Sequence, residues 1–181
     1  MKTTELLVRA VAVAAMCAVS NPSRADVRKR GTQEMRLERL FDVRLQYAEG
    51  VECAPLGERE GRLIGGGTGT VDGAKIKGKV VRWSNFERTL AEGLCALQVP
   101  AEIRTDDGAE IKFEALGNAL VPDKAQPNKW INAMTLRFQT GDARYRWLNT
   151  TLGLWEGEFD MQTLTSTGRV YAREDGTSAA R

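Results

Sequence analysis

Apolar and polar residues alternate along several stretches of this chain. Between Leu37 and Tyr47, the side chains of Phe41, Val43 and Leu45 share one side of an extended backbone with Tyr47, and mostly polar residues occupy the other side. A period of two is typical of a half-buried strand, with one face against the core and one against water. Similar or shorter runs predict further strands at 62–64, 80–83, 94–104, 110–115, 134–139, 152–155, 159–164 and 169–172.

Glycines and prolines separate these runs. The Asp-Gly pair in Thr105–Gly108 lies between two alternating runs and predicts a tight hairpin. Pro122 and Pro127 indicate a loop between 117 and 130. The glycine run Gly65–Gly69 lacks the following Lys-Ser/Thr pair and helix of a phosphate-binding loop, so close backbone packing or a bulge is the better interpretation.

These elements predict an all-β fold. About eight short strands at regular spacing are typical of an antiparallel barrel or sandwich. Beyond the N-terminal segment, the sequence has no convincing helical period of ten or more residues. The sequence therefore predicts a small antiparallel β-structure of about eight strands in one domain.

The first 25 residues have the layout of a secretory signal peptide. Lys2 and Arg9 come before or at the start of a short apolar run, and Ser23 and Ala25 are the small residues at positions −3 and −1 of the cleavage site. The run is too short to span a bilayer. A lipid anchor and a buried N-terminal helix are the two alternatives. The expected organisation is a signal peptide (1–25), a basic linker (26–35), the barrel domain (36–173) and a disordered tail (174–181).

Composition and charge narrow the function. The chain contains no histidine, which excludes a Ser-His-Asp triad and a His-bearing zinc site. Removal of the first 25 residues leaves equal numbers of basic and acidic residues, so we expect no nucleic-acid partner. The expected location is secreted or periplasmic, without stable membrane insertion. A homo-oligomer is left open.

Two cysteines, Cys53 and Cys95, remain after cleavage. An oxidising compartment permits a disulfide between them, which would stabilise the fold by about 4 kcal/mol at most in the chain-entropy model. The alternative is that Cys95 is a small buried apolar residue and that Cys53 lies in a loop.

From Arg36 to Ala172 the chain resembles the domain of unknown function 3237 (DUF3237), also called the UPF0311 proteins. The resemblance rests on Leu37–Phe41, Gly66–Thr68, Trp83, Thr105–Ala109 and, above all, Phe138–Asn149. It implies a small closed β-barrel similar to the allene oxide cyclase barrels, with an internal cavity and no established common activity. The sequence departs from the family at 98–101, which lacks an Asp and a Tyr, and at 131–134, which lacks an Arg, so part of the polar set expected in a family pocket is missing.

Trp83 and Trp147 are the aromatic residues that the resemblance carries over, and they suit the wall of a cavity for a flat apolar ligand. Core packing is the simpler alternative for both. Asn149 would join Trp147 on one side if that segment were extended; its alternative is a turn hydrogen bond. Glu114 and Arg137 would line the lumen if the apolar side chains faced outward, and would otherwise face solvent.

Asp142, Arg144 and Tyr145 bring a carboxylate, a guanidinium and a phenol close together in the chain. They are the catalytic candidates, because burial raises the pKa of a carboxyl group and a nearby phenol could complete an acid–base pair. A local turn cap with an ion pair to Arg144 is the alternative. No cofactor is expected, and Asp106 and Asp107 lack the further oxygen ligands that a calcium site needs.

Three functions fit these observations. The first is an exported barrel that binds a small apolar or aromatic molecule in its lumen. The second is a cofactor-free isomerase, cyclase or lyase that acts on a small hydrophobic substrate in the same cavity. The third is a structural or interaction protein whose barrel is filled with side chains.

Overall fold

The computed structural model describes residues 36–48, 52–56, 60–91 and 93–174 of the 181-residue chain. The predicted signal peptide, the basic linker and the tail after Glu174 lie outside this part. The described elements are β1 (Leu37–Tyr47), β2 (Glu52–Leu56), β3 (Glu60–Asp72), β4 (Lys77–Ala91), β5 (Leu94–Thr105), β6 (Glu110–Leu120), β7 (Lys129–Gln139), the 3₁₀ helix η1 (Ala143–Thr150), β8 (Leu152–Asp160) and β9 (Thr165–Arg173). The same residues contain no helix with the length and apolarity needed to cross a bilayer.

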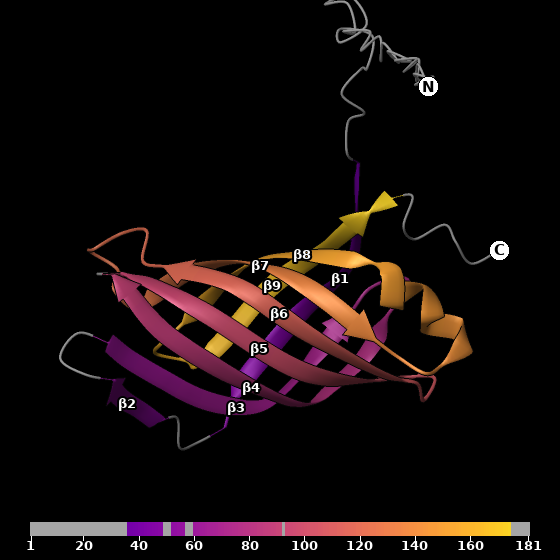
Figure 1. Cartoon of the computed structure of the whole chain (residues 1–181), viewed down its shortest axis with the longest axis horizontal. Coiled ribbons are helices and arrows are strands. Elements are labelled where there is room, and N and C mark those ends of the chain that lie inside the picture. The colour runs from indigo at the N-terminus through magenta and orange to yellow at the C-terminus, as the bar shows by residue number, and fades with distance from the viewer. Residues whose placement is uncertain (1–35, 49–51, 57–59, 92, 175–181) are drawn as a thin grey trace, which may run out of the picture. The chain divides into compact units, whose positions relative to one another are not determined.

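Eight strands close into an antiparallel barrel (Figure 1). The order around the barrel is β1-β9-β8-β7-β6-β5-β4-β3, and a further pairing of β1 with β3 closes the ring. The short β2 pairs with the first residues of β3. The predicted all-β antiparallel fold is confirmed. The pairing of β1 with β3 shows that the sheet forms a barrel and not a sandwich.

Glycines allow β1 and β3 to approach at this closure. Their register runs from Asp42 opposite Asp72 to Tyr47 opposite Gly67. A Cβ atom at Gly67 would lie 2.0 Å from the carbonyl oxygen of Gln46, so a larger residue cannot be placed there without moving the backbone. The pairing of β3 with β4 also shifts register between Gly67 and Gly69. The predicted close packing and bulge are confirmed.

The strands predicted at 62–64 and 80–83 are too short. Residues 60–72 form one strand of 13 residues, and β4 continues for 15 residues. The glycines interrupt the alternating pattern without ending the strand, because they serve the close backbone approach rather than a turn.

Of two further predictions, the Asp-Gly hairpin and the strand at 159–164, the structure confirms the first and contradicts the second. The Asp-Gly hairpin is confirmed: Thr105 N donates to the Ala109 carbonyl, and Gly108 has a φ of 88°. The predicted strand over 159–164 is wrong, since β8 ends at Asp160. The Asp160 carboxylate accepts from the backbone N–H of Gln162 at 2.8 Å, which starts a turn in place of further extension.

The inner face of the barrel divides into two halves. At the closed end, which holds the β5–β6 hairpin and η1, Phe41 and Phe113 contact Phe138 edge-on with ring centroids 6.3 and 6.4 Å apart. Leu148 of η1 is completely buried and packs into the same core. The open end, at the β8–β9 turn and the β6–β7 loop, contains the pocket described below.

Helix η1 replaces the extended segment considered for Trp147 and Asn149. Asp142 caps its start by accepting a hydrogen bond from the backbone N–H of Arg144 at 2.9 Å. At its end, the hydroxyl of Thr151 donates to the carbonyl of Trp147 at 2.9 Å. These local bonds stabilise a short helix that has no strong apolar stripe.

Candidate binding pocket at the open end of the barrel

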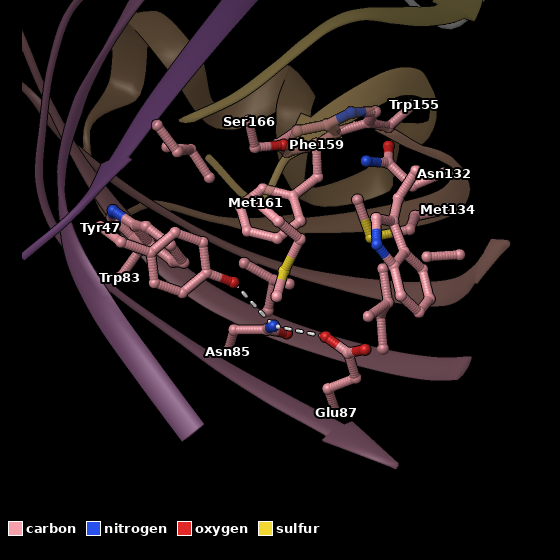
Figure 2. Close-up of a pocket in the computed structure, with 15 residues that line it drawn as sticks. Tyr47, Trp83, Asn85, Glu87, Asn132, Met134, Trp155, Phe159, Met161 and Ser166 are labelled. Carbon is pink, nitrogen blue, oxygen red and sulfur yellow. Dashed lines mark hydrogen bonds between the residues drawn. The ribbon is translucent and has the colours of Figure 1, made fainter. Parts of the chain in front are cut away.

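The pocket lies inside the barrel, beneath the β8–β9 turn, and has a volume of about 40 Å³. Figure 2 shows the Met161 side chain reaching into the middle of the lining. A volume of this size holds about three water molecules. The lining consists of Leu45, Tyr47, Trp83, Asn85, Glu87, Leu97, Val99, Ala119, Trp130, Asn132, Met134, Trp155, Phe159, Met161 and Ser166.

An aromatic cluster forms one wall of the pocket. The ring of Tyr47 meets that of Trp83 edge-on at 4.4 Å between centroids, and lies 5.2 Å from the ring of Phe159. The indole Nε1 of Trp83 donates to the carbonyl of Thr68 on β3 at 3.0 Å. This bond orients the indole of Trp83 within the wall.

The carboxamide of Asn85 links this wall to a carboxylate. Its Nδ2 donates to the Tyr47 hydroxyl at 2.8 Å and to Glu87 Oε2 at 3.3 Å. Because a carboxylate only accepts, the amide orientation is determined, and Oδ1 is the end without a partner among the described residues. Burial raises the pKa of the Tyr47 phenol well above its usual range, and the charge of Glu87 adds to the shift.

The opposite wall holds Trp155 and Asn132. Trp155 Nε1 and Asn132 Oδ1 would lie 2.5 and 2.9 Å from a Cβ atom at Gly157. Both atoms therefore pack against Gly157, in the space that a side chain there would fill. Gly168, paired with Gly157 across β8 and β9, leaves room for the same indole. Neither polar atom has a hydrogen-bond partner among the described residues, although one is a donor and the other an acceptor.

Four of the buried polar atoms without a described partner belong to residues that line this pocket: Asn85 Oδ1, Trp130 Nε1, Asn132 Oδ1 and Trp155 Nε1. An unpaired buried donor or acceptor costs about 1–3 kcal/mol. Buried polar groups in proteins are normally paired, so a cluster of exceptions needs an explanation. A bound molecule with both donors and acceptors, or ordered water, would pair these atoms.

The structure brings Trp83 into the pocket and leaves Trp147 and Asn149 outside it. The latter two lie on η1 at the closed end, where Trp147 packs half-buried against the core. The amide of Asn149 is engaged with the backbone of Thr140, which fits the turn hydrogen bond considered from the sequence. The extended conformation that would have placed Asn149 beside an aromatic wall is absent from this segment.

Glu114 and Arg137 lie on the outer face of the barrel. They are register partners on β6 and β7, and Glu114 accepts a hydrogen bond from Gln98 Nε2 at 2.8 Å. Their neighbours Phe113 and Leu136 are buried inside. The alternative in which apolar side chains face outward is therefore wrong, because the period-two pattern directs the apolar set to the lumen.

The catalytic candidates also lie at the closed end, away from the pocket. Arg144 pairs with Asp142 at 2.7 Å and with Asp107 of the β5–β6 hairpin at 2.9 Å, and the Tyr145 hydroxyl donates to the same Asp107 oxygen at 2.9 Å. The hydrogen bonds from Arg144 lower the pKa of Asp142 to about 2. A carboxylate with a lowered pKa is a poor proton donor or base near neutrality, so this group serves to tie η1 to the hairpin.

Sequence reasoning missed most of the pocket. Asn85 and Glu87 alternate with Trp83 on the inner face of β4, so a period of two starting at Trp83 would have found them. Asn132 falls in the segment that departs from the family pattern. Trp130 and Trp155 carry no signal in the sequence that separates them from core residues.

Two other features of the described residues bear on possible binding sites. A wider groove crosses β3, β1, β9, β8 and β7, is open to solvent, and contains the ion pair of Arg169 with Glu156 at 3.4 Å. Among the described residues, no group of three or more Cys, Asp or Glu side chains is placed to hold a metal ion.

The disulfide between Cys53 and Cys95, one of the two alternatives for these residues, is not tested. Cys95 is buried on β5. The side chain of Cys53 lies outside the described residues, and β3 and β4 separate its strand β2 from β5 in the sheet order. The disulfide stays a prediction.

Several solved structures share this fold. A β-barrel-like protein from Acinetobacter baumannii AYE has a TM-score of 0.68 at 20% identity, over 77% of this chain and 96% of that one. A conserved protein of unknown function from Rhodopseudomonas palustris has a TM-score of 0.69 at 21% identity, over 78% and 99%. A protein described as an enzyme from Penicillium herquei has a TM-score of 0.60 at 18% identity, over 77% and 95%. At these identities the likeness is one of fold.

The sequence matches no curated protein. The model of one family, described as a protein of unknown function (DUF3237), matches residues 35–172, which contain all eight strands of the barrel except the last residue of β9. The chain therefore belongs to the DUF3237 family.

Proposed function

We propose that this protein is exported and binds a small, largely apolar molecule in the pocket at the open end of its barrel. The observation that carries the proposal is the set of four buried polar atoms without described partners, all of which belong to residues that line one largely apolar cavity. Apolar walls with a few convergent polar groups are the usual form of a small-molecule site.

The size of the pocket requires a movement on binding. Ligand pockets usually measure a few hundred Å³, whereas this one measures about 40 Å³. Met161 lies on the β8–β9 turn and is 38% exposed, so its side chain can leave the pocket without moving a strand. Methionine is unbranched and adapts readily to a new neighbour, which suits it to this role.

The test is native mass spectrometry of the protein purified from its source, with one matched pair of variants. Ala119→Leu adds a side chain inside the pocket, and Ala133→Leu adds the same group on the exposed face of β7. We expect a small molecule of constant mass to co-purify with the wild type and with Ala133→Leu, but not with Ala119→Leu. A wild-type protein without such a molecule in repeated preparations contradicts the proposal and favours the filled barrel.

The second candidate is a cofactor-free isomerase, cyclase or lyase in the same pocket. The observation in its favour is the carboxylate of Glu87, which lies in the lining and is oriented by Asn85, as a general base would be. For any substrate found, Glu87→Gln should abolish turnover and leave the substrate bound. Unchanged turnover would remove Glu87 from the chemistry.

Export is the remaining part of the proposal. Its support is the signal-peptide layout of residues 1–25. The mature protein should begin at Asp26, which N-terminal sequencing of the isolated protein can check. A mature chain that retains residues 1–25 would contradict export by cleavage.

A further inference from the structure

The described lining of the pocket carries negative charge only. Of the described residues that line it, Glu87 alone carries a charge. Its carboxylate accepts from Asn85 Nδ2 at 3.3 Å, and the described residues of the lining include no Lys or Arg. An anionic ligand would leave water to face this carboxylate without a compensating cation. The lining therefore disfavours anions, fatty acids included.

The aromatic rings add to this preference. Five of them, from β1, β4, β7 and β8, surround a narrow space: Tyr47, Trp83, Trp130, Trp155 and Phe159. The face of an aromatic ring carries partial negative charge and attracts a cation within about 6 Å of its centroid, and tryptophan does so most strongly. Rings that enclose a small space beside one carboxylate form the usual environment for an alkylated ammonium group.

The unpartnered polar atoms define the rest of the ligand. Asn85 Oδ1 and Asn132 Oδ1 are acceptors and add negative potential, which again suits a cation. Trp130 Nε1 and Trp155 Nε1 are donors, which a cation cannot satisfy. A neutral hydroxyl or carbonyl oxygen on the ligand would accept from these indoles.

We propose that the ligand is a small alkylammonium ion that also carries a neutral oxygen. The ammonium group would lie among the rings near Glu87, and the oxygen would accept from the indole of Trp155 or Trp130. Space for about three waters, enlarged when Met161 moves, is suited to a group the size of trimethylammonium. This inference rests on the proposed function and narrows it to one ligand class.

The test compares choline with 3,3-dimethylbutan-1-ol, which has the same shape and hydroxyl group but no charge. Binding is measured by isothermal titration calorimetry and by tryptophan fluorescence. We expect choline to bind at least about tenfold more tightly, in line with the range of cation–aromatic attraction plus one carboxylate. Glu87→Gln should weaken choline binding about tenfold and leave the neutral alcohol nearly unchanged. Glu114→Gln, which makes the same change on the outer face, should affect neither.

Three outcomes overturn the inference: equal or tighter binding of the neutral alcohol, choline binding that Glu87→Gln does not weaken, and binding of neither probe. Failure here is separable from failure of the proposed function. If the neutral alcohol binds and Ala119→Leu abolishes its binding, the pocket binds ligands but does not select cations. Circular dichroism melting of each variant confirms that a loss of binding is not a loss of folding.

Discussion

Asn149 pairs with the backbone of Thr140 through both ends of its carboxamide. Thr140 N donates to Asn149 Oδ1 at 2.8 Å, and Asn149 Nδ2 donates to the Thr140 carbonyl at 3.0 Å. The side chain thus makes the two hydrogen bonds that a neighbouring strand would make beyond the end of β7. A polar residue that resembled a ligand contact is a structural link between β7 and η1.

The first prediction concerns this pair. Asn149→Ala removes both bonds and leaves the backbone of Thr140, a buried residue, without these partners. We expect the free energy of unfolding to fall by about 1–3 kcal/mol, measured by urea denaturation. Arg146→Ala, on an exposed position of the same helix, should change it by less than about 0.5 kcal/mol. Equal stability of Asn149→Ala and the wild type would show that the two hydrogen bonds do not stabilise the fold. Weaker ligand binding in Asn149→Ala would show that Asn149 contributes to the binding site.

The second prediction concerns Gly168. A Cβ atom at this position would lie 2.3 Å from Trp155 Nε1 and 2.7 Å from the carbonyl oxygen of Glu156. Gly168→Ala should therefore destabilise the barrel by about 1–3 kcal/mol through overpacking and displace the indole that lines the pocket. Gly141→Ala is the matched control, because a Cβ atom there meets nothing within 4 Å. Chemical denaturation followed by tryptophan fluorescence measures both, and a fully stable Gly168→Ala would show that Trp155 is not held over this glycine.

The third prediction concerns stability in acid. The pKa of Asp142 is lowered from 3.8 to about 2 by hydrogen bonds from Arg144, and that of Asp107 is lowered, mainly by the Thr105 hydroxyl. A carboxylate whose pKa is lower in the folded state stabilises the fold above its unfolded pKa, and this contribution is lost as the pH falls from about 4 to about 2. Asp142→Asn should thus have a lower melting temperature near neutrality and a smaller loss on acidification. An unchanged profile for Asp142→Asn would contradict the prediction.

The fourth prediction concerns Tyr47. Burial raises the pKa of its phenol in the folded state, so the phenolate forms more readily in the unfolded chain. The fold therefore loses stability as the pH rises above the ordinary pKa of 10.0. In a spectrophotometric titration, the wild type should show a tyrosine component that ionises only with alkaline unfolding, and Tyr47→Phe should lack it. Ionisation of Tyr47 near its ordinary value would mean that water reaches the pocket freely.

Local patterns predicted the inner face of β1 and the β5–β6 hairpin correctly. The inner positions of β1, from Phe41 to Tyr47, follow directly from alternation, and the Asp-Gly hairpin follows from the chemistry of its turn. Both depend on residues close together in the chain. Helix η1 was not predicted, because its eight residues have no apolar stripe and therefore no helical period in the sequence. Its capping hydrogen bonds can be identified only in the folded turn.

The pocket was less predictable, because its properties depend on contacts between distant strands. Trp83 was identified, and Asn85 and Glu87 share its face of β4. The unpaired state of Trp155 Nε1, however, depends on glycines that β8 and β9 place beneath it, and no pattern in one sequence shows that pairing. Asp142, Arg144 and Tyr145 are close together in the chain, but closeness in the chain does not show whether a group lies beside a cavity.

The central claim is that a ligand pairs the buried polar atoms at the open end of the barrel. The most direct measurement is a ¹H–¹⁵N spectrum of the indole N–H groups, recorded while choline and then 3,3-dimethylbutan-1-ol are added. The sequence has four tryptophans, and Trp147 at the closed end is the internal control. Binding should shift the signals of Trp130 and Trp155 and leave that of Trp147 in place. Unmoved signals for Trp130 and Trp155 with both compounds, or an equal shift of Trp147, would contradict the account.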